Sequence, residues 1–309
     1  MYARGGAVSQ ALEAAHRSTA RALFALCYRM MGVSADAEEL VQETFVRALE
    51  ARPREDEPLS GYLFRIATRL CIDRLRRRQT EGYRGPWLPS PVSDELLQWQ
   101  APAAAQYEML ESASFAFLLA LEALSAEQRA ALILGDVFDL SAREVGEILN
   151  LEEAHVRQLQ HRARAAMKRY DSERAPRSAE HRDQARMAMM GLFAALAAGD
   201  AEGAKRWLSD DVKILSDGGG EYAAAMVPIE GPTRVAHFFS RLMELRGPPL
   251  RFEQRRVNGA WAIDAAFEVK RPREAPRSIT FVELDASGRI ALIYSVVASR
   301  KLAAPNSYR

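Results

Sequence analysis

The spacing of apolar residues between Ser141 and Tyr170 predicts two helices joined by a tight turn. Ser141 can cap the first helix, and Glu144, three residues later, completes a capping box. Asn150 tolerates the left-handed backbone that ends a helix, so the turn is expected there. Both helices are expected to turn one apolar face inward, formed by Val145, Ile148 and Leu149 in the first and by Val156, Leu159, Ala163 and Met167 in the second.

The outer face of the second helix is polar and basic. Five Lys or Arg residues and no acid lie between Ala154 and Tyr170. Side chains near the start of such a helix can reach base edges in the major groove, and cations further along can hold phosphates. From spacing alone, two interpretations remain open: a DNA-reading helix–turn–helix, or an ordinary helical hairpin with a solvated basic face. The DNA-facing candidates are His155, Arg157, Gln158, Arg162, Arg164 and Lys168.

A second basic block lies between Ser60 and Gln79. Apolar residues recur at helical spacing, and six arginines with a single acid, Asp73, occupy the remaining positions. Tyr62 and Phe64 stand beside this basic face, where aromatic rings could stack on unpaired bases. Packing of both rings in the core is at least equally compatible with the pattern.

An acidic helix is predicted upstream, within Leu23–Ala51. Two helices meet there near Gly32, and the second is expected to bury Leu40, Val41, Phe45, Val46 and Leu49. Its outward residues at the start include Asp36, Glu38, Glu39, Gln42 and Glu43, where acids suit the helix dipole. Such a face is either solvated or docks on a basic protein partner.

In order and spacing, DAEELVQETF (36–45), YLFRIATRLCIDRLRRR (62–78) and the helix–turn–helix resemble a bacterial RNA polymerase sigma factor of the extracytoplasmic-function (ECF) group. The resemblance covers residues 20–170. It implies that core RNA polymerase and promoter DNA are partners. The implied polymerase contacts are Asp36, Glu39, Leu40, Gln42, Glu43 and Phe45. The implied contacts with a melted −10 element are Arg54, Ser60, Tyr62, Arg65, Arg69, Arg74, Arg76 and Arg77.

The helix from Glu152 to Tyr170 is similar to the −35 reader of that family. Members of that family often have Ser or Thr at the position of Glu152 and Thr at the position of His155. These two departures affect the expected promoter sequence more than the expected activity. A plain helix–turn–helix repressor is the alternative, but it would need neither the acidic helix nor the arginine block.

The C-terminal part, residues 178–309, alternates helical and strand patterns and predicts a third domain. Expected elements are a helix at 179–198 burying Met187, Met190, Phe193, Ala194 and Ala197, a helix at 232–246, and strands near 212–215, 252–257, 261–269, 279–284 and 290–297. This order predicts an α+β cone with helices in the concavity of a curved antiparallel sheet and a pocket at its open end. The expected fold is therefore multidomain: two all-α helical domains (15–80 and 113–174), a Pro/Trp linker (81–112) and the cone.

The linker and a glycine turn extend the resemblance. Trp87, flanked by prolines, either packs on its own domain or anchors into another one. GPWLPSP (85–91) is similar to the linker motif of an ECF subgroup with a fused SnoaL-like domain, although Ser90 replaces the usual acid. The turn at 217–220 resembles that subgroup's glycine motif, with Glu221 in place of a Lys or Arg, and only Lys301-Leu302 is kept of a third motif. The implied interdomain residues are Trp87, Leu88, Pro89, Asp217, Gly218, Gly219 and Gly220.

Composition narrows the remaining classes. Net charge is +1, divided as +3 over residues 1–80, −6 over 81–174 and +4 over 175–309, so cations are placed on particular faces. Two cysteines in helical patterns, scattered histidines and no long apolar stretch predict a cytoplasmic protein without a metal site, a cofactor or a membrane span. Asp217, His237 and Asp264 are the residues that an enzyme could use, but no acid–base pairing indicates one. An unknown small ligand of the cone stays open, as does a helix–turn–helix regulator that senses it.

Overall fold

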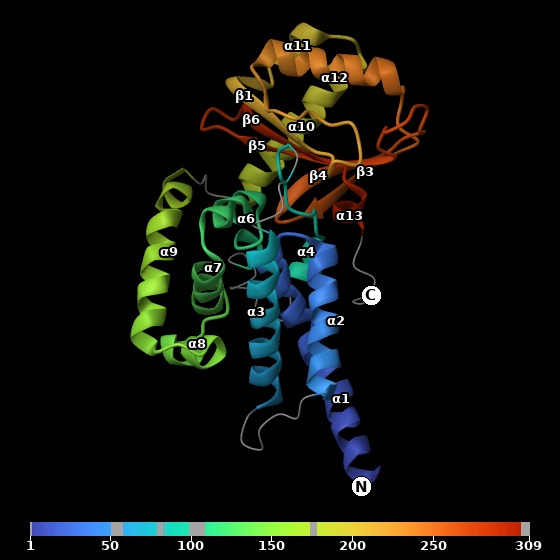
Figure 1. Cartoon of the computed structure of the whole chain (residues 1–309). Coiled ribbons are helices and arrows are strands. Elements are labelled where there is room, and N and C mark those ends of the chain that lie inside the picture. Colours follow the sequence, from blue (N-terminus) through green and yellow to red (C-terminus); the bar gives the residue numbers. More distant parts are fainter. Residues whose placement is uncertain are drawn as a thin grey trace. The chain divides into compact units, whose positions relative to one another are not determined.

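The computed structural model describes residues 2–50, 58–78, 83, 85–98, 109–173 and 178–303, which form two compact units. Of the described residues, the first unit is helical and takes 2–50, 58–78, 95–98 and 109–172. The second contains a sheet and takes 83, 85–94, 173 and 178–303. The linker segment 83–94 therefore belongs to the C-terminal unit (Figure 1).

Three long helices form the first part of the helical unit: α1 (Tyr2–Met31), α2 (Ser34–Glu50) and α3 (Leu59–Arg78). Gly32, at φ 68°, supplies the left-handed residue that turns the chain from α1 into α2. Fully buried side chains of α1, among them Leu23, Phe24 and Leu26, pack against α2 and α3. The short α4 (Asp94–Leu97) follows the linker.

The expected inner face of α2 is partly wrong. Leu40 and Val41 are buried and Phe45 is half-buried, but Val46 and Leu49 are 52% and 57% exposed. Ala37, Thr44 and Ala48 are buried instead. The small Ala and Thr side chains allow α2 to approach its neighbours closely, so the larger apolar residues of its last turns remain on the surface.

The helix–turn–helix has the boundaries that its caps predict. Short helices α6 (Phe115–Ala120), η1 (Leu121–Ala123), α7 (Ala126–Leu132) and η2 (Ile133–Val137) precede it. Helix α8 (Ala142–Leu149) begins with the Ser141–Glu144 capping box and ends at Asn150, at φ 57° and ψ 50°. Helix α9 (Glu153–Glu173) buries Val156, Leu159, Ala163 and Met167.

The C-terminal unit contains one six-stranded sheet in the order β2-β1-β6-β5-β4-β3. Its strands are β1 (Leu208–Asp217), β2 (Ile229–Glu230), β3 (Arg251–Val257), β4 (Ala260–Ala266), β5 (Arg277–Leu284) and β6 (Ile290–Val296). The expected antiparallel sheet is wrong in one pairing, because β1 and β6 are parallel. Strand β1 is longer than expected, and β4 ends before Val269, which is exposed.

Helices α10 (Ala179–Ala197), α11 (Ala201–Lys205) and α12 (Pro232–Arg246) cover one face of this sheet (Figure 1). The core between them includes Met189, Leu192, Val235, Ile214 and Ile293. The expected inner face of α10 is partly wrong: Met190 and Phe193 pack on this core, but Met187, Ala194 and Ala197 are exposed. The inner positions are Ala188, Met189, Leu192 and Leu196.

The linker crosses the other face of the sheet. Asp217 lies three positions after Ile214 on β1 and therefore points away from the helices, and it bonds Leu88. At the far edge, Ser93 bridges to Val257 at the end of β3. Residues 88–93 therefore connect the end of β1 with the end of β3, and we call them the strap.

Candidate nucleic-acid interface and linker dock

The basic face of α9 is exposed where the sequence predicts a DNA reader. His155, Arg157, Gln158, Arg162 and Lys168 are all exposed. The turn before α9 is tight, since a Cβ on Gly146 would lie 2.6 Å from the carbonyl oxygen of Leu151. Helix α9 is therefore held against α8 at a spacing that requires glycine.

Two cations on this face already have acidic partners. Arg157 pairs with Glu153 at 2.5 Å within α9, and both side chains are exposed. Arg164 makes two bonds to Asp136 of η2, at 3.0 and 2.6 Å, and these bonds raise the pKa of its guanidinium. Exposed pairs contribute little stability, so Arg157 can leave Glu153 for another partner at low cost.

The arginine block of α3 is divided between core and surface. Tyr62 is 7% exposed, which places its ring in the core in this conformation, with the Arg65 guanidinium 5.5 Å from the ring centroid. Ser60, Arg69 and Arg77 are exposed. Phe64 is half-buried and meets Phe138 edge-on. The predicted contact Arg54 lies outside the described residues.

Three arginines near the end of α3 form ion pairs with glutamates. Arg74 pairs with Glu39 of α2 at 3.5 Å. Arg76 pairs with Glu127 of α7 at 2.5 Å, and Arg78 with Glu122 of η1 at 2.8 Å. The pKa of Glu127 is lowered, because hydrogen bonds and the charge of Arg76 outweigh the opposing effect of burial.

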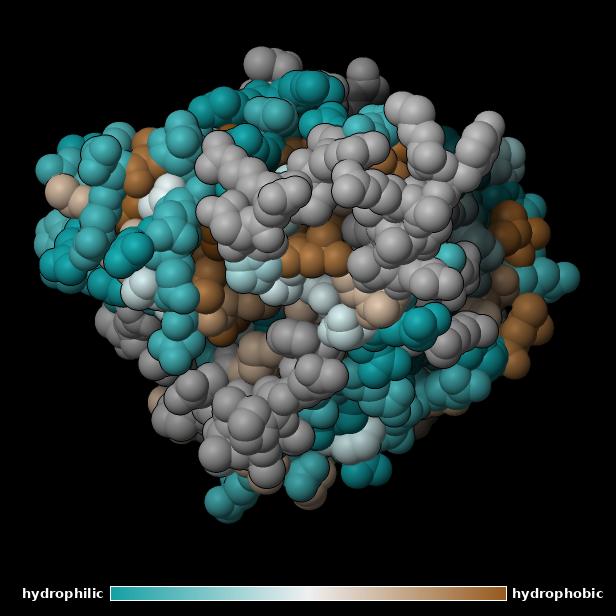
Figure 2. All heavy atoms as spheres, turned by 90° about the horizontal axis from the view of Figure 1, so that it is seen from below, coloured by the Kyte–Doolittle hydropathy of each residue, from teal (hydrophilic) through white to brown (hydrophobic). Residues whose placement is uncertain are grey.

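The outward stripe of α2 combines acids and apolar side chains. Glu39, Gln42 and Glu43 precede Val46 and Leu49 at positions that follow one another on one side of a helix. Glu43 pairs with Arg47, and Asp36 is half-buried. Leu40, a predicted partner contact, is 1% exposed and belongs to the core. In the view of Figure 2 the coloured surface is mostly hydrophilic with separate brown apolar patches, which is ordinary for a protein surface.

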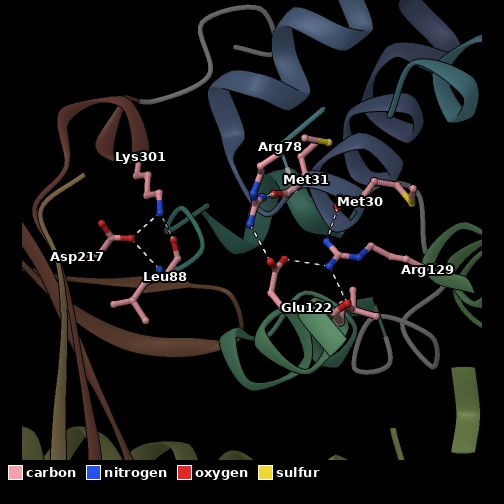
Figure 3. Close-up of polar contacts among 9 residues, drawn as sticks. Met30, Met31, Arg78, Leu88, Glu122, Arg129, Asp217 and Lys301 are labelled. Atoms are coloured by element: carbon pink, nitrogen blue, oxygen red, sulfur yellow. Dashed lines mark hydrogen bonds and ion pairs between the residues drawn. The ribbon is translucent and has the colours of Figure 1, made fainter. Parts of the chain in front are cut away.

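A buried ion pair in the C-terminal unit binds the linker (Figure 3). Asp217 accepts hydrogen bonds from the amide of Leu88 at 2.7 Å and from the hydroxyl of Tyr83 at 2.5 Å. Lys301, on the short helix α13 (Ser299–Leu302), donates to Asp217 at 2.5 Å and to the carbonyl of Leu88 at 2.6 Å. Both side chains are buried, so this pair engages both backbone groups of Leu88 in a site that excludes water. We call Asp217, Lys301 and their linker contacts the linker dock.

Aromatic rings of the linker complete the dock. The ammonium of Lys301 lies 4.8 Å from the ring centroids of both Tyr83 and Trp87. Cation–π attraction strengthens when the cation is desolvated, as it is here. Trp87 itself is half-buried, whereas Leu88, Pro89 and Ser90 are buried.

A second anchor holds the end of the strap. Asn258, at φ 51°, accepts the amide of Val92 on its side chain at 2.8 Å and donates its own amide to the carbonyl of Val92. Asp94 accepts the amide of Gly259 at 2.8 Å and pairs with Arg256 at 3.0 Å. Burial raises the pKa of Asp94 despite these partners.

The glycine turn places Asp217 and α13 beside each other. A Cβ on Gly218 would lie 2.6 Å from the carbonyl oxygen of Tyr222, and Gly219, at φ 62°, approaches Ala298 closely. Gly220 also has a positive φ, of 73°. Glu221, the departure from the subgroup motif, accepts the amide of Ser299 at the start of α13.

The remaining acid and base candidates lie in separate surroundings. Asp264 has no exposed surface and binds the guanidinium groups of Arg277, Arg255 and Arg251. His237 is exposed and lines a groove of about 770 Å³ between α10, α11 and α12. The lining of this groove contains helix and turn residues and no strand residue. The groove is therefore not the pocket expected at the open end of the cone.

Within the described ranges, no group of three or more His, Cys, Asp or Glu is placed to hold a metal ion. Likewise, none of the helices in the described part of the chain combines the length and apolar character of a membrane span.

Several dock residues were missed from the sequence. Asn258-Gly259 is a two-residue hairpin signal between strand patterns and could have located the second anchor. Lys301 stands in the retained Lys-Leu pair, but its partners lie 84 and 213 residues away. Tyr83 carries no local signal for its bond to Asp217.

Family models match two parts of the chain: Sigma-70 region 2 at residues 16–81 and Sigma-70, region 4 at residues 114–167. The ECF RNA polymerase sigma factor SigJ of Mycobacterium tuberculosis (strain ATCC 25618 / H37Rv) is 36% identical over 236 residues, which cover 74% of this chain and 72% of that protein. The chain belongs to the ECF RNA polymerase sigma factors.

The likeness extends through both units of this ECF sigma factor. The crystal structure of the M. tuberculosis SigJ covers 91% of this chain and 94% of that chain, with a TM-score of 0.67 and 28% identity. SigW of Bacillus subtilis (strain 168) is 32% identical over 156 residues, covering 48% of this chain and 81% of that protein. The ECF sigma factor therefore combines helical region 2 and region 4 domains with a C-terminal SnoaL-like α+β cone.

Proposed function

We propose that this ECF sigma factor binds core RNA polymerase through α2, recognises −10 and −35 promoter elements through α3 and α9, melts the DNA and initiates transcription. Family membership supports the general activity. The exposed acidic and apolar stripe of α2 and the exposed basic face of α9 support these assignments of surfaces.

The C-terminal cone regulates this activity in cis, through the linker. One observation carries this proposal: the buried Asp217–Lys301 pair binds both backbone groups of Leu88 in the segment between the two DNA-facing domains. A docked linker leaves fewer residues to connect region 2 with region 4, so docking changes how far apart the two promoter readers can move.

In-vitro transcription with purified core polymerase tests both parts. Core-dependent initiation by the full chain establishes the sigma activity, and DNA binding with no initiation would favour a repressor. Asp217→Asn weakens the dock, and a version ending near Pro176 lacks the cone. If the dock regulates, both changes shift promoter output in the same direction. Asp210→Asn, which removes an exposed carboxylate of the same domain, is the matched control.

A further inference from the structure

Two glutamates of region 4 form ion pairs with arginines of α3, the helix assigned to the −10 element. Glu122 uses one carboxylate oxygen for Arg78 of α3, at 2.8 Å, and the other for Arg129 of α7, at 3.0 Å (Figure 3). Glu127, five residues further on, accepts two bonds from Arg76 of α3. Region 4 thus places two carboxylates against the basic end of the helix that is assigned to promoter DNA.

The same arginines also cap a helix of region 2. Helix α1 ends at Met31, so the carbonyl oxygens of its last turn have no partner within the helix. Arg129 donates to the carbonyl of Met30 at 2.7 Å, and Arg78 donates to that of Met31 at 3.0 Å. Arg129 is 4% exposed. The buried Arg129 of region 4 therefore caps the C-terminal end of α1 in region 2.

This arrangement is incompatible with reading both promoter elements. Elements centred near −35 and −10 are separated by about 25 base pairs, roughly 85 Å of B-form DNA. Helices α3 and α7 are in direct contact here, and α3 also packs against α8. Region 2 and region 4 must therefore separate before one chain can contact both elements.

We propose that Glu122 and Glu127 act as an internal competitor for promoter phosphates, holding region 2 and region 4 closed until polymerase and DNA take over Arg76 and Arg78. We call this set of contacts the acidic clasp. It rests on the proposed sigma function for its consequence in transcription, whereas the closed state itself is measurable without polymerase.

Glu122 carries most of the clasp. Its partner Arg129 is 4% exposed, and the side chains of Arg78 and Glu122 are 25% and 35% exposed, so water screens these pairs less than it screens the pair of Arg76 with Glu127. Arg76 is 62% exposed, and an exposed pair with Glu127 adds little. Opening the clasp leaves Arg129 with fewer partners, which favours reclosure in the absence of DNA.

The test compares Glu122→Gln, Glu127→Gln and the parent in the full chain. Donor and acceptor dyes on Glu50→Cys and Arg143→Cys report the separation of the two domains, since both positions are exposed and the native Cys27 and Cys71 are buried. A fluorescent single strand carrying a −10 sequence, titrated over a series of salt concentrations, reports access to α3. Glu244→Gln is the control: it removes one acid and one exposed ion pair, with Arg241, in the cone.

We expect Glu122→Gln to lower energy transfer and to raise affinity for the single strand about fivefold or more, within the usual range of coupling between sites. Glu127→Gln should act in the same direction with a smaller effect and serves if Glu122→Gln folds poorly. Unchanged energy transfer in both variants, with single-strand affinity no higher than in Glu244→Gln, would overturn the clasp. If the clasp opens but the chain does not initiate with core polymerase, the sigma function fails and the clasp stands.

Discussion

Lys301 is the residue on which the linker dock depends. It is 5% exposed and compensates the buried carboxylate of Asp217 while it holds the carbonyl of Leu88. Removing one partner of a buried pair leaves an uncompensated charge, which is more damaging than losing an exposed pair.

Lys301→Met should therefore destabilise the C-terminal unit by about 3–5 kcal/mol. Chemical denaturation of the full chain, followed by tryptophan fluorescence, measures the change. Lys205→Met breaks the exposed pair with Glu202 and should have little effect. Equal effects of the two substitutions would contradict the role of Lys301.

The buried carboxylate of Asp264 should make the stability of the C-terminal unit depend on pH in the acidic range. Burial alone would raise the pKa of its carboxyl, but the hydrogen bonds and charges of Arg277, Arg255 and Arg251 outweigh burial and lower the pKa. A lowered native pKa stabilises the fold fully above the ordinary value of about 3.9, and this stabilisation declines as the pH falls through the native pKa.

Melting temperature should accordingly fall between about pH 5 and pH 3. The slope should be flatter in Asp264→Asn than in the parent, and Asp210→Asn, which changes an exposed carboxylate, should keep the parent slope. A slope that Asp264→Asn leaves unchanged would assign the acid sensitivity to other groups.

At the scale of elements, local signals predicted structure well and distant ones did not. The boundaries of α8 follow from Ser141, Glu144 and Asn150, which lie within ten residues of each other. The prediction of the inner face of α10 was partly wrong. Met and Ala residues occur on all sides of this helix, so the periodicity of apolar residues does not single out one face. The linker dock joins residues 84 to 213 positions apart, and no local pattern encodes such contacts.

The misplaced residues of α2 lead to a prediction of their own. Val46 and Leu49 are exposed beside Glu39, Gln42 and Glu43, so a partner that covers the acids also covers them. Val46→Glu should change the free energy of unfolding by no more than about 0.5 kcal/mol, as surface substitutions usually do. The variant should compete less well than the parent chain for binding to core polymerase. Met187→Glu, at an exposed position of the cone, is the control; equal competition by both variants would remove Val46 from the interface.

We propose that helix α9 reads bases near its start and binds phosphates further along. Arg157 stands near its start and pairs only weakly with Glu153, so Arg157→Ala should relax preference at one base pair and cost about 1–3 kcal/mol there. Lys168→Ala, three turns later, should weaken all promoters alike and lower the salt dependence of binding. A panel of single-base −35 variants distinguishes the two; uniform weakening by Arg157→Ala would refute its assignment.

At the scale of the whole molecule, the linker is part of a folded unit and not a loose connection. The amides of Leu88 and Val92 donate to Asp217 and Asn258 in buried surroundings. Hydrogen exchange of the segment 86–93 should therefore be slow in the full chain and faster in Lys301→Met. Rapid exchange in the parent would show that the dock is open in solution.

The strap has a consequence for which changes of chain length the protein can accept. Leu88, Pro89, Ser90 and Val92 are buried, and hydrogen bonds to the sheet domain fix the segment at both ends. One inserted residue between Leu88 and Val92 would displace these buried side chains and move one anchor out of reach of its partner. Insertions and deletions should therefore be excluded from this short stretch, although connecting segments usually tolerate them.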